Sequence, residues 1–87
     1  MKRNPEFLLR QVADSQVLVP VGRAAVEFPG MITLNGVGSY LWELLEQEQT
    51  AESLAQALTE RYEVTYDTAL EDVNAYLSRL QEAKALL

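Results

Sequence analysis

The sequence lacks the two residue types on which most catalytic and metal sites depend. It contains no cysteine, so disulfides and thiolate metal sites are excluded and nothing indicates an oxidising compartment. It contains no histidine, which removes the commonest general base and the commonest metal ligand. Without histidine, no serine has its usual activating base. We therefore expect no catalytic residue, no metal site and no cofactor, and a protein that is not an enzyme by itself.

The acidic residues and the glycines of this sequence do not form a metal site or a phosphate-binding site either. Asp67, Glu71 and Asp72 lack the oxygen-ligand loop of a calcium site, and a solvated helix face explains them better. The run Gly36-Val37-Gly38 lacks the further glycines and the lysine of a phosphate-binding loop. Glycines at the start of a helix instead favour the close approach of another backbone or side chain at that end.

The sequence also lacks any long hydrophobic run. No segment approaches the roughly 20 apolar residues that cross a bilayer. Near the start, only Phe7-Leu8-Leu9 separate the charged N-terminus from Arg10, which is too short for the apolar core of a signal peptide. We expect no membrane partner and a cytoplasmic protein.

Size and charge narrow the class further. The chain has 87 residues, of which 48% are hydrophobic, so residues 1–87 are predicted to form one small folded domain. The net charge of −6 is uneven: residues 1–40 carry a balance of +1, and residues 41–87 carry −7. An acidic half of this kind is a poor nucleic-acid binder, because contacts from Lys and Arg to phosphates supply most of that affinity.

The first part of the chain reads as short strands. Residues 7–13 and 16–21 are predicted to pair as a hairpin around Asp14-Ser15, after a frayed end at residues 1–6. Residues 24–28 are predicted to continue as strand, and Pro29-Gly30 suits the centre of a type II turn. A strand over residues 31–34 follows, and we expect its Ile32 and Leu34 to face the core.

The second part reads as three helices. Asn35, Thr50 and Thr65 are the expected N-caps, and the last helix is predicted to end near Ala83. Core stripes at helical spacing follow each cap, the longest of them being Ala69, Val73, Leu77 and Leu80. By its spacing Trp42 lies at the border of its stripe or outside it, although a tryptophan is more often a core residue than an interface anchor. The tail Leu86-Leu87 is expected to fold back. The fold class is therefore α+β: a small antiparallel sheet of about three strands followed by three helices, like a winged helix-turn-helix.

Binding is better supported than catalysis. The strand at residues 31–34 is apolar on both faces and carries no Lys or Pro to protect an edge. On the last helix, Tyr76 and Arg79 are residue types enriched at interfaces. The alternative that Tyr76 belongs to the core and Arg79 is simply solvated stays open at this point.

The order of motifs resembles the PqqD family of leader-peptide-binding domains, also called RiPP recognition elements. The resemblance is carried by Leu34-Asn35, by the apolar helix Leu41–Leu45, by Asp72-Val73, and by Leu80 with Leu86-Leu87. A further helix contributes Thr50, Leu54, Leu58 and Tyr62. Together these motifs cover nearly the whole chain, from about Phe7 to Leu87.

The resemblance implies a function and a site. Members of this family hold the leader of a ribosomally made precursor peptide as an added strand and present it to a modifying enzyme, often a radical SAM protein and, for lasso peptides, a protease. Pyrroloquinoline quinone (PQQ) biosynthesis is one such pathway. Carried onto this sequence, the site residues are Met31, Ile32, Thr33 and Leu34 of the strand with Asp72, Ala75, Tyr76 and Arg79 of the helix. The chain itself is expected to be a monomer or weak dimer.

Two departures and two alternatives accompany this hypothesis. The segment at residues 22–30 is longer than a simple hairpin, and Ala85 stands where a glycine commonly precedes the final leucines. The longer segment favours a relative that serves a modified peptide other than the PQQ precursor. The alternative functions are a winged-helix DNA-binding regulator and a structural or oligomerisation module, because a fold alone does not set function.

Overall fold

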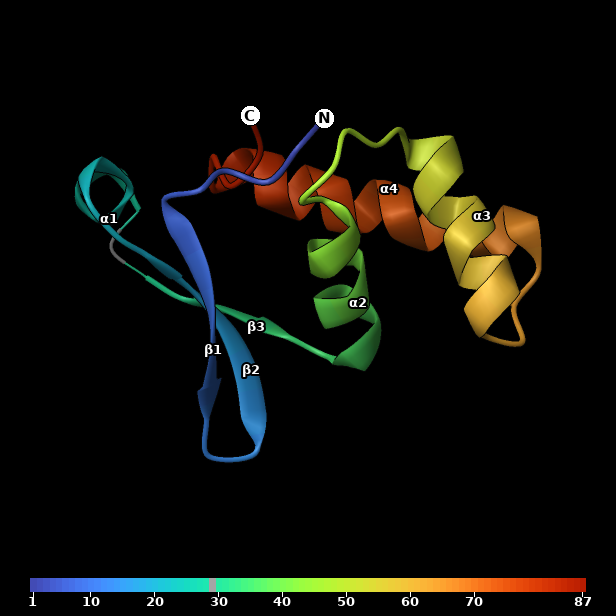
Figure 1. The fold of residues 1–87 in the computed structure, drawn as a ribbon, viewed down its shortest axis with the longest axis horizontal. Helices are drawn as coiled ribbons and strands as arrows, with labels where there is room; N and C mark the ends of the chain where they lie inside the picture. Colours follow the sequence, from blue (N-terminus) through green and yellow to red (C-terminus); the bar gives the residue numbers. More distant parts are fainter. Residues whose placement is uncertain (29) are drawn as a thin grey trace.

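The computed structural model describes residues 1–28 and 30–87, and Figure 1 shows a small sheet beside a layer of helices. The elements follow the order β1 (Phe7–Val12), β2 (Ser15–Pro20), α1 (Arg23–Glu27), β3 (Ile32–Leu34), α2 (Gly36–Leu44), α3 (Ala51–Arg61) and α4 (Tyr66–Glu82). The predicted α+β class is confirmed. Part of the expected Pro29-Gly30 turn lies outside the described residues.

The sheet is antiparallel, with strand order β1-β2-β3. The predicted hairpin is confirmed, although its turn lies at Ala13-Asp14, one residue before the expected position. Among the described residues the sheet ends at β3, and this strand pairs on one side only, with β2. Ile32 and Leu34 are buried as predicted. Met31, which precedes the strand, and Thr33, which lies between them, are exposed. The strand therefore anchors one face in the core and leaves its outer edge unpaired.

The strand predicted over residues 24–28 is wrong, because this segment forms the short helix α1. Gly22 has a φ of 61°, which turns the chain out of the sheet after β2. The Glu6 carboxylate then accepts a hydrogen bond of 3.1 Å from the Ala24 amide, one of the amides left unpaired at a helix start. Alanine at positions 24 and 25 also favours helix over strand.

The three long helices begin at the predicted residues. The side chains of Asn35, Thr50 and Thr65 each accept from the backbone amide three residues further on. In α3 the Ser53 side chain also accepts from the Thr50 amide, which completes a capping box. The predicted stripe of α4 is buried throughout, so this helix forms the back wall of the core. No helix within residues 1–28 and 30–87 is both long and apolar enough to pass through a membrane.

Helical spacing placed Trp42 at the border of the α2 stripe or outside it, and the structure buries this side chain in the core. Its exposed fraction is 2%, which makes it the largest fully buried side chain. The Arg3 guanidinium lies 5.8 Å from its ring centroid and donates a hydrogen bond of 3.1 Å to its backbone carbonyl. The N-terminal segment thus covers the side of α2 that helical spacing alone would leave exposed.

The N-terminal segment is not frayed, contrary to the prediction. The Arg3 amide donates to the Leu45 carbonyl, and the Asn4 amide donates to the Ala85 carbonyl, at 2.8 and 2.7 Å. The two chain ends consequently lie close together beside α4 (Figure 1). The C-terminal tail folds back as expected, through a bridge between Arg3 and Leu86, although Leu87 itself is 72% exposed.

Lys84 gives a test of the α4 terminus. The residue has a φ of 60° directly after the C-cap, where glycine is the preferred residue. We expect Lys84→Gly to raise the free energy of unfolding by about 1 kcal/mol, because glycine adopts this conformation without steric cost. Urea unfolding measures the change. Lys84→Ala is the matched control, since it also removes the exposed ion pair with Glu27 but keeps a side-chain β-carbon; equal stability of the two variants would contradict the explanation.

Candidate functional site: a groove along the free edge of β3

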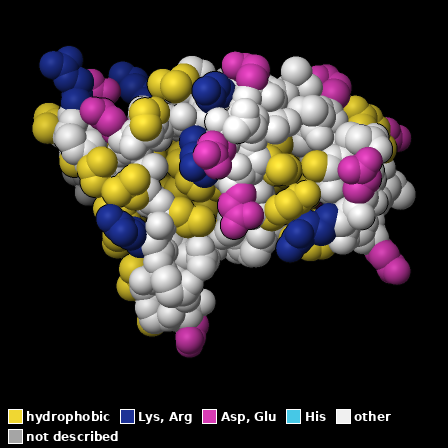
Figure 2. Space-filling model, in the orientation of Figure 1, with side chains coloured by type: hydrophobic (Ala, Val, Ile, Leu, Met, Phe, Trp, Pro, Cys, Tyr) yellow, Lys and Arg dark blue, Asp and Glu magenta, His cyan; other side chains and the backbone are white. Residues whose placement is uncertain are grey.

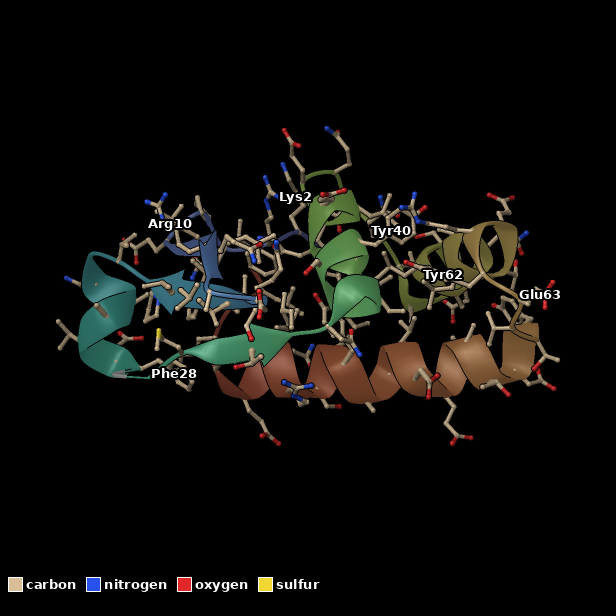
Figure 3. The ribbon with its side chains drawn as sticks, turned by 90° about the horizontal axis from the view of Figure 1, so that it is seen from below. Lys2, Arg10, Phe28, Tyr40, Tyr62 and Glu63 are labelled. Atoms are coloured by element: carbon tan, nitrogen blue, oxygen red, sulfur yellow. The ribbon has the colours of Figure 1, made fainter. Side chains whose placement is uncertain are left out.

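A groove follows the free edge of β3 and separates it from α4. It consists of two adjoining hollows of about 640 and 500 Å³, which share Thr33 and Arg79 as lining residues. Figure 3 shows β3 and α4 running beside each other, with Phe28 near the end of the groove next to α1. We call this surface the β3–α4 groove.

All the site residues carried over from the family resemblance line this groove. The first hollow is lined by Thr33 and Leu34 from the strand, and by four residues of α4: Asp72, Ala75, Tyr76 and Arg79. The second hollow adds Met31 and Ile32. Thr33, Ala75 and Arg79 are exposed and thus accessible from solvent, whereas Ile32, Leu34 and Tyr76 are largely buried and form the floor. The structure therefore brings together residues that lie some 40 positions apart in the sequence.

Several lining residues were missing from the sequence prediction. Those of the first hollow are Asn35, Val37, Gly38, Leu41 and Leu58, and those of the second are Phe28, Glu82 and Ala83. Glu82 and Ala83 continue the three- and four-residue spacing of the predicted α4 strip, so helical periodicity was a sufficient signal for them. Leu58 carried no such signal, because it reaches this hollow from α3, which packs against α4 only in the tertiary structure.

Gly38 and Tyr76 join α2 to α4 at the bottom of the first hollow. The Tyr76 hydroxyl donates a buried hydrogen bond of 2.8 Å to the Gly38 carbonyl. A β-carbon on Gly38 would lie 3.3 Å from Cε1 of the Tyr76 ring, whereas one on Gly36 would meet nothing within 4 Å. The expected close approach at this glycine pair is thus confirmed for Gly38. Tyr76 is therefore both a core residue and part of the groove, because its buried ring also lines the first hollow.

Charge in the groove is confined to its α4 wall. Asp72 lies in the first hollow, Glu82 in the second, and Arg79 between them. Within the described residues, no carboxylate lies in ion-pairing distance of Arg79. Burial raises the pKa of Tyr76 well above its usual range, and the nearby Arg79 charge offsets only part of this effect. Tyr76 therefore stays a hydrogen-bond donor at any physiological pH.

Tyr76→Phe tests the bond between the helices. We expect a loss of about 1–2 kcal/mol in unfolding free energy, because the buried Gly38 carbonyl loses the hydrogen bond that the Tyr76 hydroxyl donates. Because burial raises the Tyr76 pKa, the native state opposes deprotonation. The stability that the neutral Tyr76 side chain contributes is complete at pH values below about 10, its ordinary pKa in the unfolded chain. It declines as the pH rises above that value. Urea unfolding should show a smaller alkaline loss for the variant than for the parent. Tyr66→Phe, at an exposed position, is the control; equal costs at both sites would contradict this role.

Metal chemistry finds no support in the described part of the chain. No group of three or more carboxylates or other ligands gathers where it could hold an ion. Tyr40 and Tyr62 contact each other edge-on, with ring centroids 6.1 Å apart, and the Arg61 guanidinium lies 4.4 Å from the Tyr40 ring centroid. Figure 3 shows both rings between α2 and α3, away from the β3–α4 groove.

Comparison with known proteins agrees with the fold. The model of the family "Coenzyme PQQ synthesis protein D (PqqD)" matches residues 15–86. The chain belongs to the PqqD family. No curated protein matches it.

Two solved structures are similar to this PqqD-family chain. The first is TbiB1 in complex with the TbiA(beta) leader peptide, with 26% identity, a TM-score of 0.77, and coverage of 99% of this chain and 94% of that one. The second is lasso peptide synthetase B1 complexed with the leader peptide, with 27% identity, a TM-score of 0.72, and coverage of 93% and 89%.

Proposed function

We propose that this chain is a recognition element that captures the leader segment of a ribosomally made precursor peptide and presents it to a modifying enzyme. The peptide adds to β3 as an extended strand in the β3–α4 groove. The observation that supports this most is the unpaired edge of β3 facing a hollow lined by α4. Membership of the PqqD family and the leader-peptide complexes of both structural neighbours support it further.

Backbone pairing supplies the common part of the affinity. The outer edge of β3 offers amide and carbonyl groups that no strand within the described residues satisfies, and an extended peptide can pair with them. The leader loses conformational freedom when it becomes a strand, at a cost of roughly 2–5 kcal/mol. A net affinity near a Kd of about 1 μM, or about −8 kcal/mol, is the expected result.

Side chains along the groove supply sequence preference. Leu34, Leu41 and Tyr76 form the apolar base of the first hollow. This hollow therefore accepts an apolar peptide side chain. Arg79 lies where the two hollows meet and has no ion-pair partner among the described residues, so a peptide carboxylate at this point gains a charge-assisted hydrogen bond. The chain itself performs no chemistry in this proposal and acts by holding the substrate.

Peptide selection with NMR tests the proposal. A displayed library of random linear peptides is selected on the immobilised chain, with the TbiA(beta) leader peptide as a second probe. We expect the selected peptides to shift the amide signals of β3 and of the groove side of α4, and to leave those of β1 unshifted. Recovery of no binding peptide, or shifts centred on another surface, would refute the proposal.

The second partner is the modifying enzyme, which we propose to be a radical SAM protein acting in the cytoplasm. The genes beside this one test that class, because a short peptide gene and a radical SAM gene are expected together. A protease gene of the lasso type in its place would reject the radical SAM assignment and keep the leader-binding function.

DNA binding is disfavoured, since α4 exposes Asp67, Glu71 and Asp72 against the single cation Arg79.

A further inference from the structure

Backbone pairing alone does not fix the position of a peptide on β3. The strand spans only Ile32–Leu34, and its outer edge offers amide and carbonyl groups to any sequence. A peptide shifted by two residues would keep its side chains on the same faces and form equivalent backbone bonds. The proposed function, on which this inference rests, therefore needs side chains that favour one register of the leader over its neighbours.

Three charged side chains of α4 line the β3–α4 groove in the order acidic, basic, acidic. Asp72 lines the first hollow, Glu82 lines the second, and Arg79 lines both. All three are exposed, and none forms an ion pair with another residue of the described chain. Their spacing of seven and three residues keeps them on one face of the helix. The strand side of both hollows contributes no charge.

The spacing of these charges matches that of an extended peptide lying beside α4, as β3 does in Figure 3. Glu82 follows Asp72 by ten residues, which is a rise of about 15 Å along a helix. Three alternate residues of a strand, at positions n−2, n and n+2, span about 13 Å. The long Arg79 side chain leans toward the helix N-terminus, as helical side chains do, which brings its guanidinium toward the middle of the span. Position n therefore faces Arg79, and its two neighbours on the same face meet the carboxylates.

An added strand covers these side chains, so the sign of each peptide charge matters. A peptide carboxylate at position n forms a charge-assisted pair with Arg79. The same carboxylate shifted by two residues faces Asp72 or Glu82, where like charges repel. Figure 2 shows further acidic side chains spread over the helical part of the molecule, and residues 41–87 carry a balance of −7. This field disfavours any additional acidic residue in the peptide.

We propose that Arg79, placed between Asp72 and Glu82, sets the register of the bound leader by pairing with one acidic side chain at a single position. The leaders that this chain recognises then carry Asp or Glu at position n and uncharged or basic residues at n−2 and n+2. Attraction at Arg79 and repulsion at the two carboxylates act together, because discrimination between registers needs a penalty for the wrong ones as well as a gain for the right one.

A set of three synthetic peptides tests this register. They derive from the tightest peptide of the display selection, whose common acidic position defines n, and differ only in whether a single glutamate stands at n−2, n or n+2. Fluorescence anisotropy measures their Kd. We expect the peptide with glutamate at n to bind the parent chain about tenfold tighter than the other two. Arg79→Glu, which circular dichroism checks for folding, is expected to make that peptide the weakest of the three.

Isosteric variants of the carboxylates test the repulsive contacts one at a time. Asp72→Asn is expected to strengthen binding of one shifted peptide about threefold, and Glu82→Gln that of the other. Glu71→Gln is the matched control, because Glu71 is exposed on the same helix but lines neither hollow. An equal effect of Glu71→Gln and Asp72→Asn would show that only the overall charge of the helix matters, which would overturn the assignment.

Failure of the register and failure of the proposed function give different results. Selected peptides that bind the groove without a common acidic position, or a peptide set with three equal affinities, would overturn the register and leave leader binding intact. Recovery of no binding peptide would refute both.

Discussion

Ala75→Trp is expected to abolish peptide binding and to leave the domain folded. Ala75 is exposed on α4 and lines the first hollow of the β3–α4 groove, opposite Thr33 and Leu34. An indole at this position occupies the space that the added peptide strand requires. We expect the Kd of the tightest peptide from the display selection to rise by about 100-fold or more, which corresponds to about 2.7 kcal/mol.

Asn74→Trp is the matched control for this experiment. Asn74 is the adjacent exposed residue of α4 and is absent from the lining of both hollows. Both variants place a tryptophan on the surface of the same helix turn, with stability changes expected within about 0.5 kcal/mol of each other. Fluorescence anisotropy of the labelled peptide measures binding, and circular dichroism confirms the fold. Equal affinity of the two variants would show that the peptide does not lie in the groove.

Trp42→Ala is expected to have the largest effect on stability. Trp42 is 2% exposed and lies where α2 meets the N-terminal segment and β1. Removing a buried indole costs about 3–5 kcal/mol, through lost transfer free energy and the cavity that remains. A domain of this size has a total stability near the lower end of about 5–15 kcal/mol. The variant is therefore expected to be largely unfolded at 37 °C.

Thermal unfolding followed by circular dichroism measures this loss. Val26→Ala is the control, because Val26 is 83% exposed on α1 and its truncation should leave the melting temperature nearly unchanged. A melting temperature of Trp42→Ala close to that of the control would mean that the indole contributes little to the core, which would contradict its burial.

Features of this chain that depend on neighbouring residues were predictable, and those that depend on distant segments were not. The helix starts at Asn35, Thr50 and Thr65 were predictable because a capping side chain bonds to an amide only three residues away. Strand alternation placed Ile32 and Leu34 on one face, and the more apolar of the two faces was expected to meet the core. The burial of Trp42 did not follow, because its cover comes from Arg3 and the N-terminal segment, which no periodicity within α2 records.

The prediction for the segment after β2 was also wrong because it depended on contacts with distant residues. Alternating Val26 and Phe28 suggested a strand, but a strand also needs a partner edge, and Gly22 directs this segment away from the sheet. The Glu6 carboxylate that satisfies the start of α1 lies on a part of the chain 18 residues earlier. The strand that alternation suggested was thus overridden by a contact that the local sequence does not contain.

For this protein, the sequence by itself determined the class of fold, the starts of α2, α3 and α4, the alternation of the short apolar strand that ends at Leu34, and the mixed polar and aromatic strip on α4. These features depend on spacing within a single element, and spacing is written in the sequence. Only the tertiary structure decided that β3 and α4 enclose a groove, that Gly38 accepts the Tyr76 hydroxyl, and that Arg79 lies where the two hollows of this groove meet. Each of these depends on contacts between distant segments, and the free energy of such contacts exists only once the chain has packed.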